Sequence, residues 1–220
     1  MEFSTKEIGR YPLLHTQPES YLLRHVSRKM HAKTLRLRML SSYAQGHLLA
    51  LLTRMIQTRH ILEIGSYTGY SALCLCQNLT HNGLLLTIDR NKELEGFIRN
   101  VFAQSEYASR VALRIDRAIS IIPQFTDTCD MVFTDADKIN YFAYYCLTTQ
   151  KVRPGGLIMA DNALRSGKAV GQVPQKPDRE NSTLLDFSKK VGDDPRVKPN
   201  LLSVRDGLVI AQVDQLLHTH

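Results

Sequence analysis

The chain has 220 residues, of which 43% are hydrophobic and 22% charged, and its formal net charge is +7. This balance excludes a disordered chain, and the length favours a single domain over residues 1–220. No run approaches the ~18 apolar residues of a membrane span, and the first twenty residues lack the apolar stretch of a secretory signal, so we expect a cytoplasmic protein without a membrane partner.

The N-terminal segment, residues 1–58, is predicted to be helical around 19–30 and 44–57. The basic charge is concentrated between residues 20 and 62, because the chain outside that range has 20 basic against 21 acidic residues. This charge indicates a solvated helical face, a face that meets another subunit, or a surface for an anionic partner such as nucleic acid or a phosphate-bearing acceptor. Between Ser20 and Leu62 the basic residues are Arg24, Arg28, Lys29, Lys33, Arg36, Arg38, Arg54 and Arg59.

From residue 60 to about 213 the chain alternates short apolar runs with longer amphipathic ones. Strands are predicted at 60–65, 84–89, 110–115, 129–135 and 156–161, the last opened by a turn at 153–156. Helices are predicted at 70–79, 92–104 and 139–151, with a short helix that ends near Pro123. This order is typical of a doubly wound, Rossmann-like parallel sheet, and the unbroken apolar LLLTI predicts a strand covered on both faces.

The C-terminal part differs from this alternation. A loop at 173–179 and a helix near 182–191 precede the run LLSVRDGLVIAQV. In that run Asp206-Gly207 is typical of a hairpin turn between two strands. We therefore expect the sheet to end in an antiparallel pair.

Chemistry is expected beyond the carboxyl ends of the parallel strands. Gly65 and Gly69 follow the first strand, where they allow a tight turn close to a ligand. Asp89 ends the second strand, at the position of an acid that binds ribose hydroxyls. Since GxGxxG is absent, a dinucleotide is not indicated, and a nucleoside without phosphate suits the turn. S-adenosylmethionine is the common ligand of that kind.

The fourth and fifth strands end in polar side chains. Asp135 follows one strand, and Asp161-Asn162 ends the other. Adjacent parallel strands would bring these three side chains to one rim, where oxygen ligands favour Mg²⁺, Mn²⁺ or Ca²⁺ over zinc. Each acid taken alone is also explained as a helix N-cap after a strand.

Several segments resemble the metal-dependent O-methyltransferases that include caffeoyl-CoA and catechol O-methyltransferases. They are ILEIGSYTGYSAL, DMVFTDADKINYF, VRPGGLIMADNALRSG and DPRVKPNLLSVRDGL, together with RMLSSYAQGHLLALL before the first strand. The resemblance covers roughly residues 18–213. It implies a seven-stranded methyltransferase sheet whose last strand is antiparallel, and a homodimer.

The resemblance also implies roles for individual residues. The metal ligands would be Asp135, Asp161 and Asn162, and Lys138 would be the general base near the acceptor hydroxyl. The positions that match the cofactor site are Met39 and Ser41 over the methionyl part, Glu63, Gly65, Ser71, Asp89 on the ribose, Ala118 at the adenine, and Asp135. A structural lysine at a helix start is the alternative for Lys138.

The expected activity is methyl transfer from S-adenosylmethionine to a metal-activated hydroxyl of a small molecule, of the vicinal diol, catechol or CoA-ester kind. The sequence departs from the family pattern at three places. Where a Trp is usual two or three positions after Asn162, this chain has Ala163-Leu164-Arg165, which argues against a flat phenylpropanoid acceptor and suits an anionic one. Arg117 stands where a small residue is usual at the adenine pocket, and Arg205 replaces the glycine of the common VGDG turn. Methylation of hydroxyuridine in tRNA stays open because of the basic segment, as does a noncatalytic binding protein on the same fold.

Overall fold

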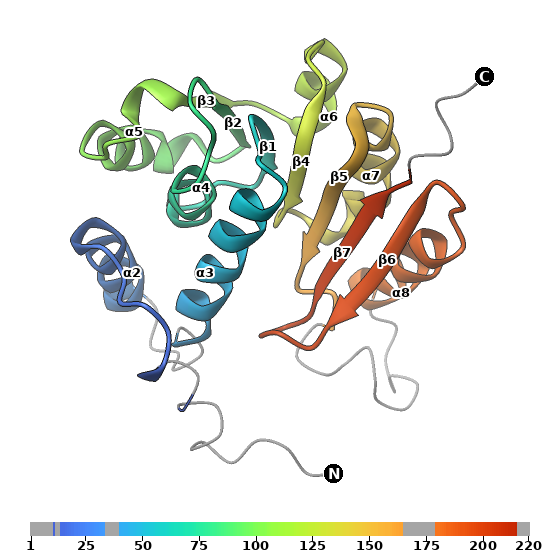
Figure 1. Cartoon of the computed structure of the whole chain (residues 1–220), viewed down its shortest axis with the longest axis horizontal. Coiled ribbons are helices and arrows are strands. Elements are labelled where there is room, and N and C mark those ends of the chain that lie inside the picture. The colour runs from blue at the N-terminus through green and yellow to red at the C-terminus, as the bar shows by residue number, and fades with distance from the viewer. Residues whose placement is uncertain (1–10, 12–13, 34–39, 165–178, 215–220) are drawn as a thin grey trace.

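The computed structural model describes residues 11, 14–33, 40–164 and 179–214. Within them, seven strands form one sheet in the order β3-β2-β1-β4-β5-β7-β6 (Figure 1). The first five strands are parallel, and β7 is antiparallel to both of its neighbours, so the predicted fold class is confirmed. The strands are β1 (His60–Ile64), β2 (Leu84–Asp89), β3 (Val111–Ile115), β4 (Cys129–Thr134), β5 (Val152–Asp161), β6 (Val197–Leu202) and β7 (Leu208–Val213).

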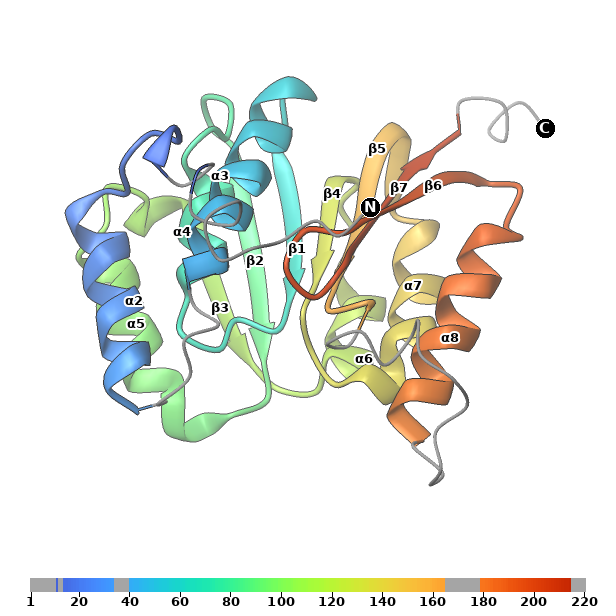
Figure 2. The same ribbon diagram turned by 90° about the horizontal axis from the view of Figure 1, so that it is seen from below.

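Helices cover both faces of the sheet (Figure 2). Helices α2 to α5 pack on one face and α6 to α8 on the other. None of the helices in the described ranges is long and apolar enough to cross a membrane. The helices are α2 (Tyr21–Lys33), α3 (Leu40–Met55), α4 (Tyr70–Cys76), α5 (Glu95–Ala103), α6 (Ala118–Ile121), α7 (Tyr141–Thr149) and α8 (Arg179–Gly192), with 3₁₀ turns at Lys92–Leu94, Ala108–Arg110, Ile122–Gln124 and Lys138–Asn140.

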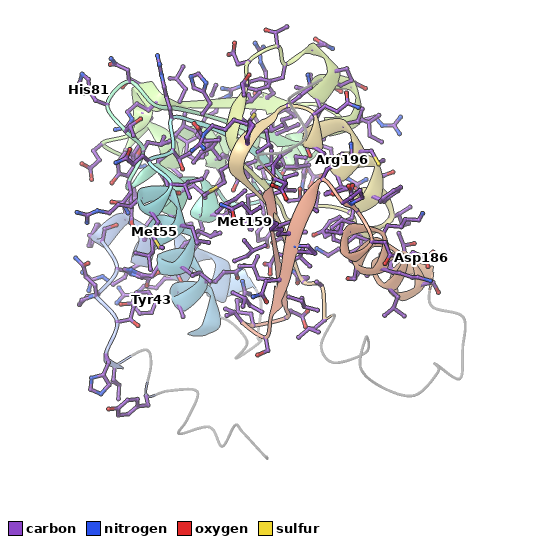
Figure 3. The ribbon with its side chains drawn as sticks, turned by 45° about the vertical axis from the view of Figure 1, so that its right-hand side comes forward. Tyr43, Met55, His81, Met159, Asp186 and Arg196 are labelled. Carbon is purple, nitrogen blue, oxygen red and sulfur yellow. The ribbon has the colours of Figure 1, made fainter. Side chains whose placement is uncertain are left out.

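The core is divided by the sheet into two apolar layers. Along β4, Met131 packs in the layer of α2 to α5, whereas Val132 packs in the layer of α6 to α8. Both faces are therefore buried, which explains why the strand sequences lack polar alternation. Met159 of β5 is completely buried in the layer of α2 to α5, whereas Met55 and Asp186 lie on the outside of the molecule (Figure 3).

Strand β5 begins earlier than predicted. The segment 153–156 was expected to be a turn, but it lies inside the strand. A register shift between Cys129 and Met131 accommodates the extra residues as a bulge, and Gly155 takes a φ of 77°. The bulge is held by an ion pair of 2.5 Å between Arg153 Nε and Asp130 Oδ1. A long-range contact thus overrides the local turn preference of Pro and Gly.

The register aligns the strand ends that carry polar residues. Ile64 at the end of β1 pairs with Ile88 of β2 and with Thr134 of β4. Thr134 in turn pairs with Ala160 of β5. The next residue in each strand or loop therefore belongs to one row across four strands. That row, called here the carboxyl-end row, consists of Asp89, Gly65, Asp135 and Asp161.

Candidate functional site

Two neighbouring cavities open at the carboxyl-end row. The first has a volume of about 380 Å³ and the second about 220 Å³. Gly65, Tyr67 and Asp135 line both cavities, so a ligand in one would lie next to a ligand in the other. This arrangement suits an enzyme that brings two small molecules together at Asp135.

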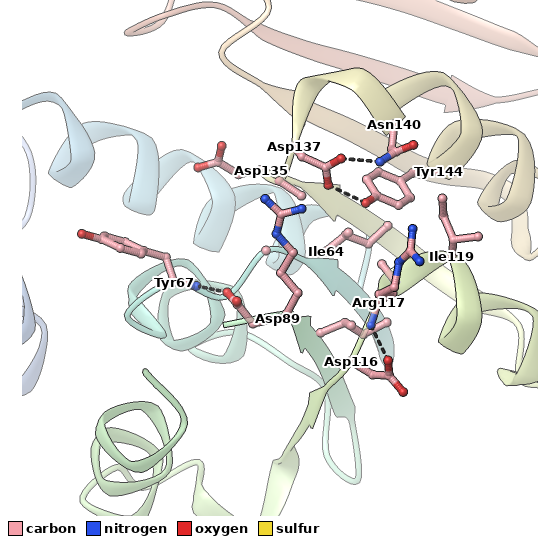
Figure 4. Close-up of a pocket in the computed structure, with 15 residues that line it drawn as sticks. Ile64, Tyr67, Asp89, Asp116, Arg117, Ile119, Asp135, Asp137, Asn140 and Tyr144 are labelled. Carbon is pink, nitrogen blue, oxygen red and sulfur yellow. Dashed lines mark hydrogen bonds between the residues drawn. The ribbon is translucent and has the colours of Figure 1, made fainter. Parts of the chain in front are cut away.

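The first cavity combines an apolar wall with a fixed carboxylate (Figure 4). The wall includes Ile64, Ile88 and Ala118. Asp89 Oδ2 accepts a hydrogen bond of 2.7 Å from the backbone N–H of Tyr67, and its Oδ1 accepts one of 2.8 Å from the N–H of Asn91. Each carboxylate oxygen keeps acceptor capacity for a ligand hydroxyl. The cavity thus offers what a nucleoside requires.

The turn after β1 needs glycine at Gly65. Its φ is +98°, and a Cβ there would overlap the backbone carbonyl oxygen of Asp135. The N–H of Gly65 donates to Ile88 O at 2.8 Å, while the N–H of Asp135 donates to Ile64 O at 2.9 Å. The turn is therefore held against both neighbouring strands, and only a residue without a side chain allows this approach.

The second cavity contains the predicted metal ligands Asp135 and Asp161. Asp161 is only 2% exposed, and its Oδ1 accepts a hydrogen bond of 2.7 Å from the backbone N–H of Asn162. The Asn162 side chain donates from Nδ2 to Asp135 Oδ1 at 3.0 Å. The three residues therefore meet at one rim, as predicted from their strands.

This rim fits a hard dication. Burial, and next the charge of Asp135, raises the pKa of Asp161, so a cation between the two carboxylates would relieve an unfavourable pair. Asn162 would present its side-chain Oδ1 to a cation after a flip of the side-chain amide that exchanges Oδ1 and Nδ2. Among the described residues no group of three or more His, Cys, Asp or Glu side chains could hold a metal. The candidate set is instead two carboxylates and one amide, a hard oxygen donor set.

Lys138 lies at the same rim, at the start of the 3₁₀ turn before α7. Its Nζ is 3.1 Å from Asp135 Oδ1 and also donates a hydrogen bond to Tyr141 Oη. Tyr141 is fully buried, and its hydroxyl donates to the carbonyl oxygen of Asp161 at 3.1 Å. The ammonium is therefore held between Asp135 and Tyr141, with 17% of the side chain exposed.

Glu63 lies in β1, two residues before Gly65, and is completely buried. Burial raises its pKa to about 7, although hydrogen bonds from Ser71 and Thr87 act in the opposite direction. Thr87 Oγ1 donates to Glu63 Oε2 at 2.5 Å, whereas Oε1 has no partner at hydrogen-bonding geometry within the described residues. Ser71 also lines the second cavity, which connects Glu63 to the site.

The raised pKa of Glu63 predicts a pH-dependent stability. The folded state binds a proton between pH 4.5 and about 7 that the unfolded chain releases, so the free energy of unfolding should fall over this range and then level off. The contribution is about 3 kcal/mol. Glu63→Gln should remove it, and urea unfolding at pH 5 and pH 8 measures the difference. Glu93→Gln on the surface is the control; an equal pH slope in wild type and Glu63→Gln would contradict the prediction.

Part of the predicted site is not described. Met39 and Arg165 lie outside the described residues, and Ser41 belongs to α3 without a described side chain. Of the basic segment, the exposed side chains that are described are Arg24, Arg28, Arg54 and Arg59. The side chains of Lys29 and Lys33, and the whole of Arg36 and Arg38, lie outside the description.

Other residues reach the site without having been predicted. Gln45 of α3 is 3% exposed and lines the second cavity, and Tyr144 of α7 lines the first. Tyr67 has a φ of 46° and lines both cavities. A polar residue one turn before Leu49, on the apolar side of a helix, was the available signal for Gln45.

Comparison with known proteins shows similarity to O-methyltransferases over most of the chain. The model of a family described as O-methyltransferase matches residues 15–213. A catechol O-methyltransferase from Niastella koreensis is 31% identical over 178 residues, which cover 77% of this chain and 80% of that protein. Caffeoyl-CoA O-methyltransferase 5 of Nicotiana tabacum is 31% identical over 185 residues, covering 79% and 77%.

Solved structures agree in fold. An O-methyltransferase from Bacillus cereus in complex with SAH has a TM-score of 0.84 and 27% identity, covering 94% of this chain and 97% of that one. TomG from Streptomyces achromogenes, an O-methyltransferase involved in tomaymycin synthesis and solved with SAM, has a TM-score of 0.82 and 27% identity, covering 94% and 96%.

Proposed function

Because the chain belongs to the O-methyltransferase family, we propose that it transfers the methyl group of S-adenosylmethionine to a hydroxyl of a small vicinal diol, of the catechol or CoA-ester kind, with the help of a divalent cation. The observation that carries this proposal is the carboxyl-end row. It joins a cavity suited to a nucleoside with a cavity that holds two carboxylates, and the two meet at Asp135.

The methyl donor would span both cavities. Asp89 would accept hydrogen bonds from the ribose hydroxyls, and Ala118 would contact the adenine. The remaining proposed cofactor residues would surround the methionyl part, with Met39 and Ser41 closing over it. Those residues are Glu63, Gly65, Ser71 and Asp135, and the last three line the second cavity.

The divalent cation, Mg²⁺, Mn²⁺ or Ca²⁺, would be held by Asp135, Asp161 and Asn162. When bound it lowers the pKa of an acceptor hydroxyl and orients it through an adjacent oxygen. Lys138 Nζ, which lies 3.1 Å from Asp135, would take the hydroxyl proton after its ammonium has released a proton to water. Methyl transfer is an in-line displacement, so the rim must also aim the oxygen at the methyl carbon. The buried Tyr141 would help to hold that rim in place through its hydrogen bond to the carbonyl oxygen of Asp161.

The chain would act as a single domain over residues 1–220 and as a homodimer in the cytoplasm. Leu51 and Met55, on the outer face of α3, are 52% and 68% exposed, which supports an interface there. Cys74, Cys76 and Cys129 are buried free thiols, which suits a reducing compartment.

A second candidate function is methylation of hydroxyuridine in tRNA. It is favoured by Arg24 and Arg28, which lie one turn apart on α2 and are both exposed. Phosphate contacts by these side chains would make binding of bulk tRNA steeply salt-dependent. The third alternative, a noncatalytic binding protein, gives no reason for Lys138 to lie beside the carboxylate rim.

The test is transfer of labelled methyl groups to catechols, CoA esters and bulk tRNA. We expect transfer to a small diol, its loss with a chelator and its return with Mg²⁺, Mn²⁺ or Ca²⁺. Label in tRNA alone would favour the second candidate. Binding of S-adenosylmethionine without transfer to any acceptor would favour the noncatalytic protein.

A further inference from the structure

Arg205 occupies an unusual backbone position in the turn between β6 and β7. Its φ is 53°, in the left-handed region that glycine favours, and Gly207 two residues later has a φ of 88°. A long cationic side chain is thus kept at a place where glycine would meet less strain.

The Arg205 side chain points into the second cavity and forms part of its lining. Its Nη1 donates a hydrogen bond of 2.7 Å to Gln45 Oε1 and lies 3.9 Å from Asp161 Oδ2. Of the described residues that line this cavity, Arg205 is the one Lys, Arg or His. The side chain is 30% exposed, so the guanidinium can be reached by a molecule in the cavity.

The charges in the cavity explain what the guanidinium would bind. Asp135 and Asp161 carry two negative charges, which a dication would balance. The guanidinium and the methyl donor, with its sulfonium, each add one positive charge. An acceptor oxyanion compensates one of these, but its proton would leave Lys138 positively charged, so the cavity and its rim together keep an excess of positive charge. A second anionic group on the acceptor would reduce this excess, and guanidinium groups bind carboxylates in a planar, two-pronged geometry.

We propose that Arg205 is a specificity-determining residue that binds a free carboxylate of the acceptor, whose class is therefore a small hydroxylated aromatic acid. The inference rests on the proposed methyl transfer and narrows its substrate. Because Nη1 lies beside Asp161, the acid group must be close to the reacting diol. The phosphates of a CoA ester lie far from its diol, so they cannot fill this position in a cavity of about 220 Å³.

The alternative is that Arg205 only fastens the β6–β7 turn to α3 through Gln45. The two roles separate in Arg205→Gln, which keeps hydrogen-bonding capacity toward Gln45 and loses the charge, and in Arg205→Lys, which keeps the charge. Arg99→Gln provides a matched control, since Arg99 forms a surface ion pair with Glu95. Each protein is assayed with 3,4-dihydroxybenzoate and with its methyl ester, at saturating S-adenosylmethionine and Mg²⁺.

Wild type and Arg99→Gln should prefer the acid to the ester in kcat/KM by about tenfold or more, mostly through KM. Arg205→Lys should keep most of this preference, and Arg205→Gln should lose it. Titration calorimetry with SAH and Mg²⁺, where no methyl is transferred, should show the same loss of affinity for the acid. The proposal would be overturned if wild type had equal kcat/KM values for acid and ester, or if it did not bind the acid. An equal fall in kcat/KM for both acceptors in Arg205→Gln would also overturn it.

Failure of the carboxylate site and failure of the methyltransferase function would give different experimental results. Methylation of the ester without preference for the acid removes the role of Arg205 and leaves the methyltransferase function intact. Binding of the acid that depends on Arg205, with no methyl transfer to any acceptor, removes the proposed function and keeps the carboxylate site.

Discussion

Replacing Asp161 with Asn is expected to lower kcat/KM for a diol acceptor by about 100-fold or more, while the affinity for S-adenosylmethionine changes little. An amide is a much weaker ligand for a hard dication than a carboxylate, and in the proposed mechanism several kcal/mol of transition-state stabilisation would depend on that ion. The substitution keeps an oxygen for the N–H of Asn162, so the rim should keep its shape. Calorimetry with SAH and Mg²⁺ added separately measures the two affinities.

Asp130→Asn is the matched control at the opposite end of the sheet. Burial alone would raise the pKa of Asp130, but hydrogen bonds from Arg153 and from the backbone N–H groups of His60 and Arg59 lower it. This carboxylate therefore stabilises the fold, and its loss should lower the unfolding free energy with turnover retained in the folded enzyme. Full activity of Asp161→Asn after exhaustive chelation would show that the metal mechanism is wrong.

Gly65→Ala is expected to give the largest loss of stability. The added methyl group would overlap the carbonyl oxygen of Asp135 in a backbone conformation with a φ of +98°. Overpacking and strain together should cost about 4 kcal/mol. Any folded fraction should bind SAH poorly, because a shift at residue 65 moves the wall shared by both cavities.

The control is Gly96→Ala in α5, where a Cβ would meet nothing within 4 Å. Alanine is the better helix former, so this variant should be more stable by about 0.5–1 kcal/mol. Guanidinium unfolding measures both changes on the same enzyme. If Gly65→Ala unfolds with the wild-type midpoint, the tight approach of β1 and β4 is not needed.

The alternation of strands and helices was enough to predict the sheet and the meeting of Asp135, Asp161 and Asn162. Parallel strands end at the same edge, so residues that follow them gather without knowledge of any contact. The early start of β5 could not be predicted, because Pro154 and Gly155 favour a turn and the competing ion pair joins Arg153 to Asp130, 23 residues away.

The residues that line the second cavity could not all be predicted from the sequence either. Gln45 and Arg205 are 160 positions apart and meet only because the β6–β7 turn lies over α3. Arg205 could be identified from the sequence as a departure from the glycine of related chains. That its side chain points into the second cavity is known only from the structure. Local patterns thus predicted which strand ends bring polar side chains together, and long-range packing decided which other side chains reach them.

The position of β7 in the sheet has a consequence for biosynthesis. Of the seven strands it is made last, yet it is inserted between β5 and β6, and β6 has no other partner in the described sheet. The turn before β7 also holds the loop after Asn162, since the N–H of Ala163 donates to Gly207 O at 2.9 Å. A nascent chain therefore carries the side chains of the carboxyl-end row long before β7 can fix them in place. The sheet can close only when residues 208–213 insert between β5 and β6, so we expect the carboxyl-end row to reach its final geometry in a late step of folding.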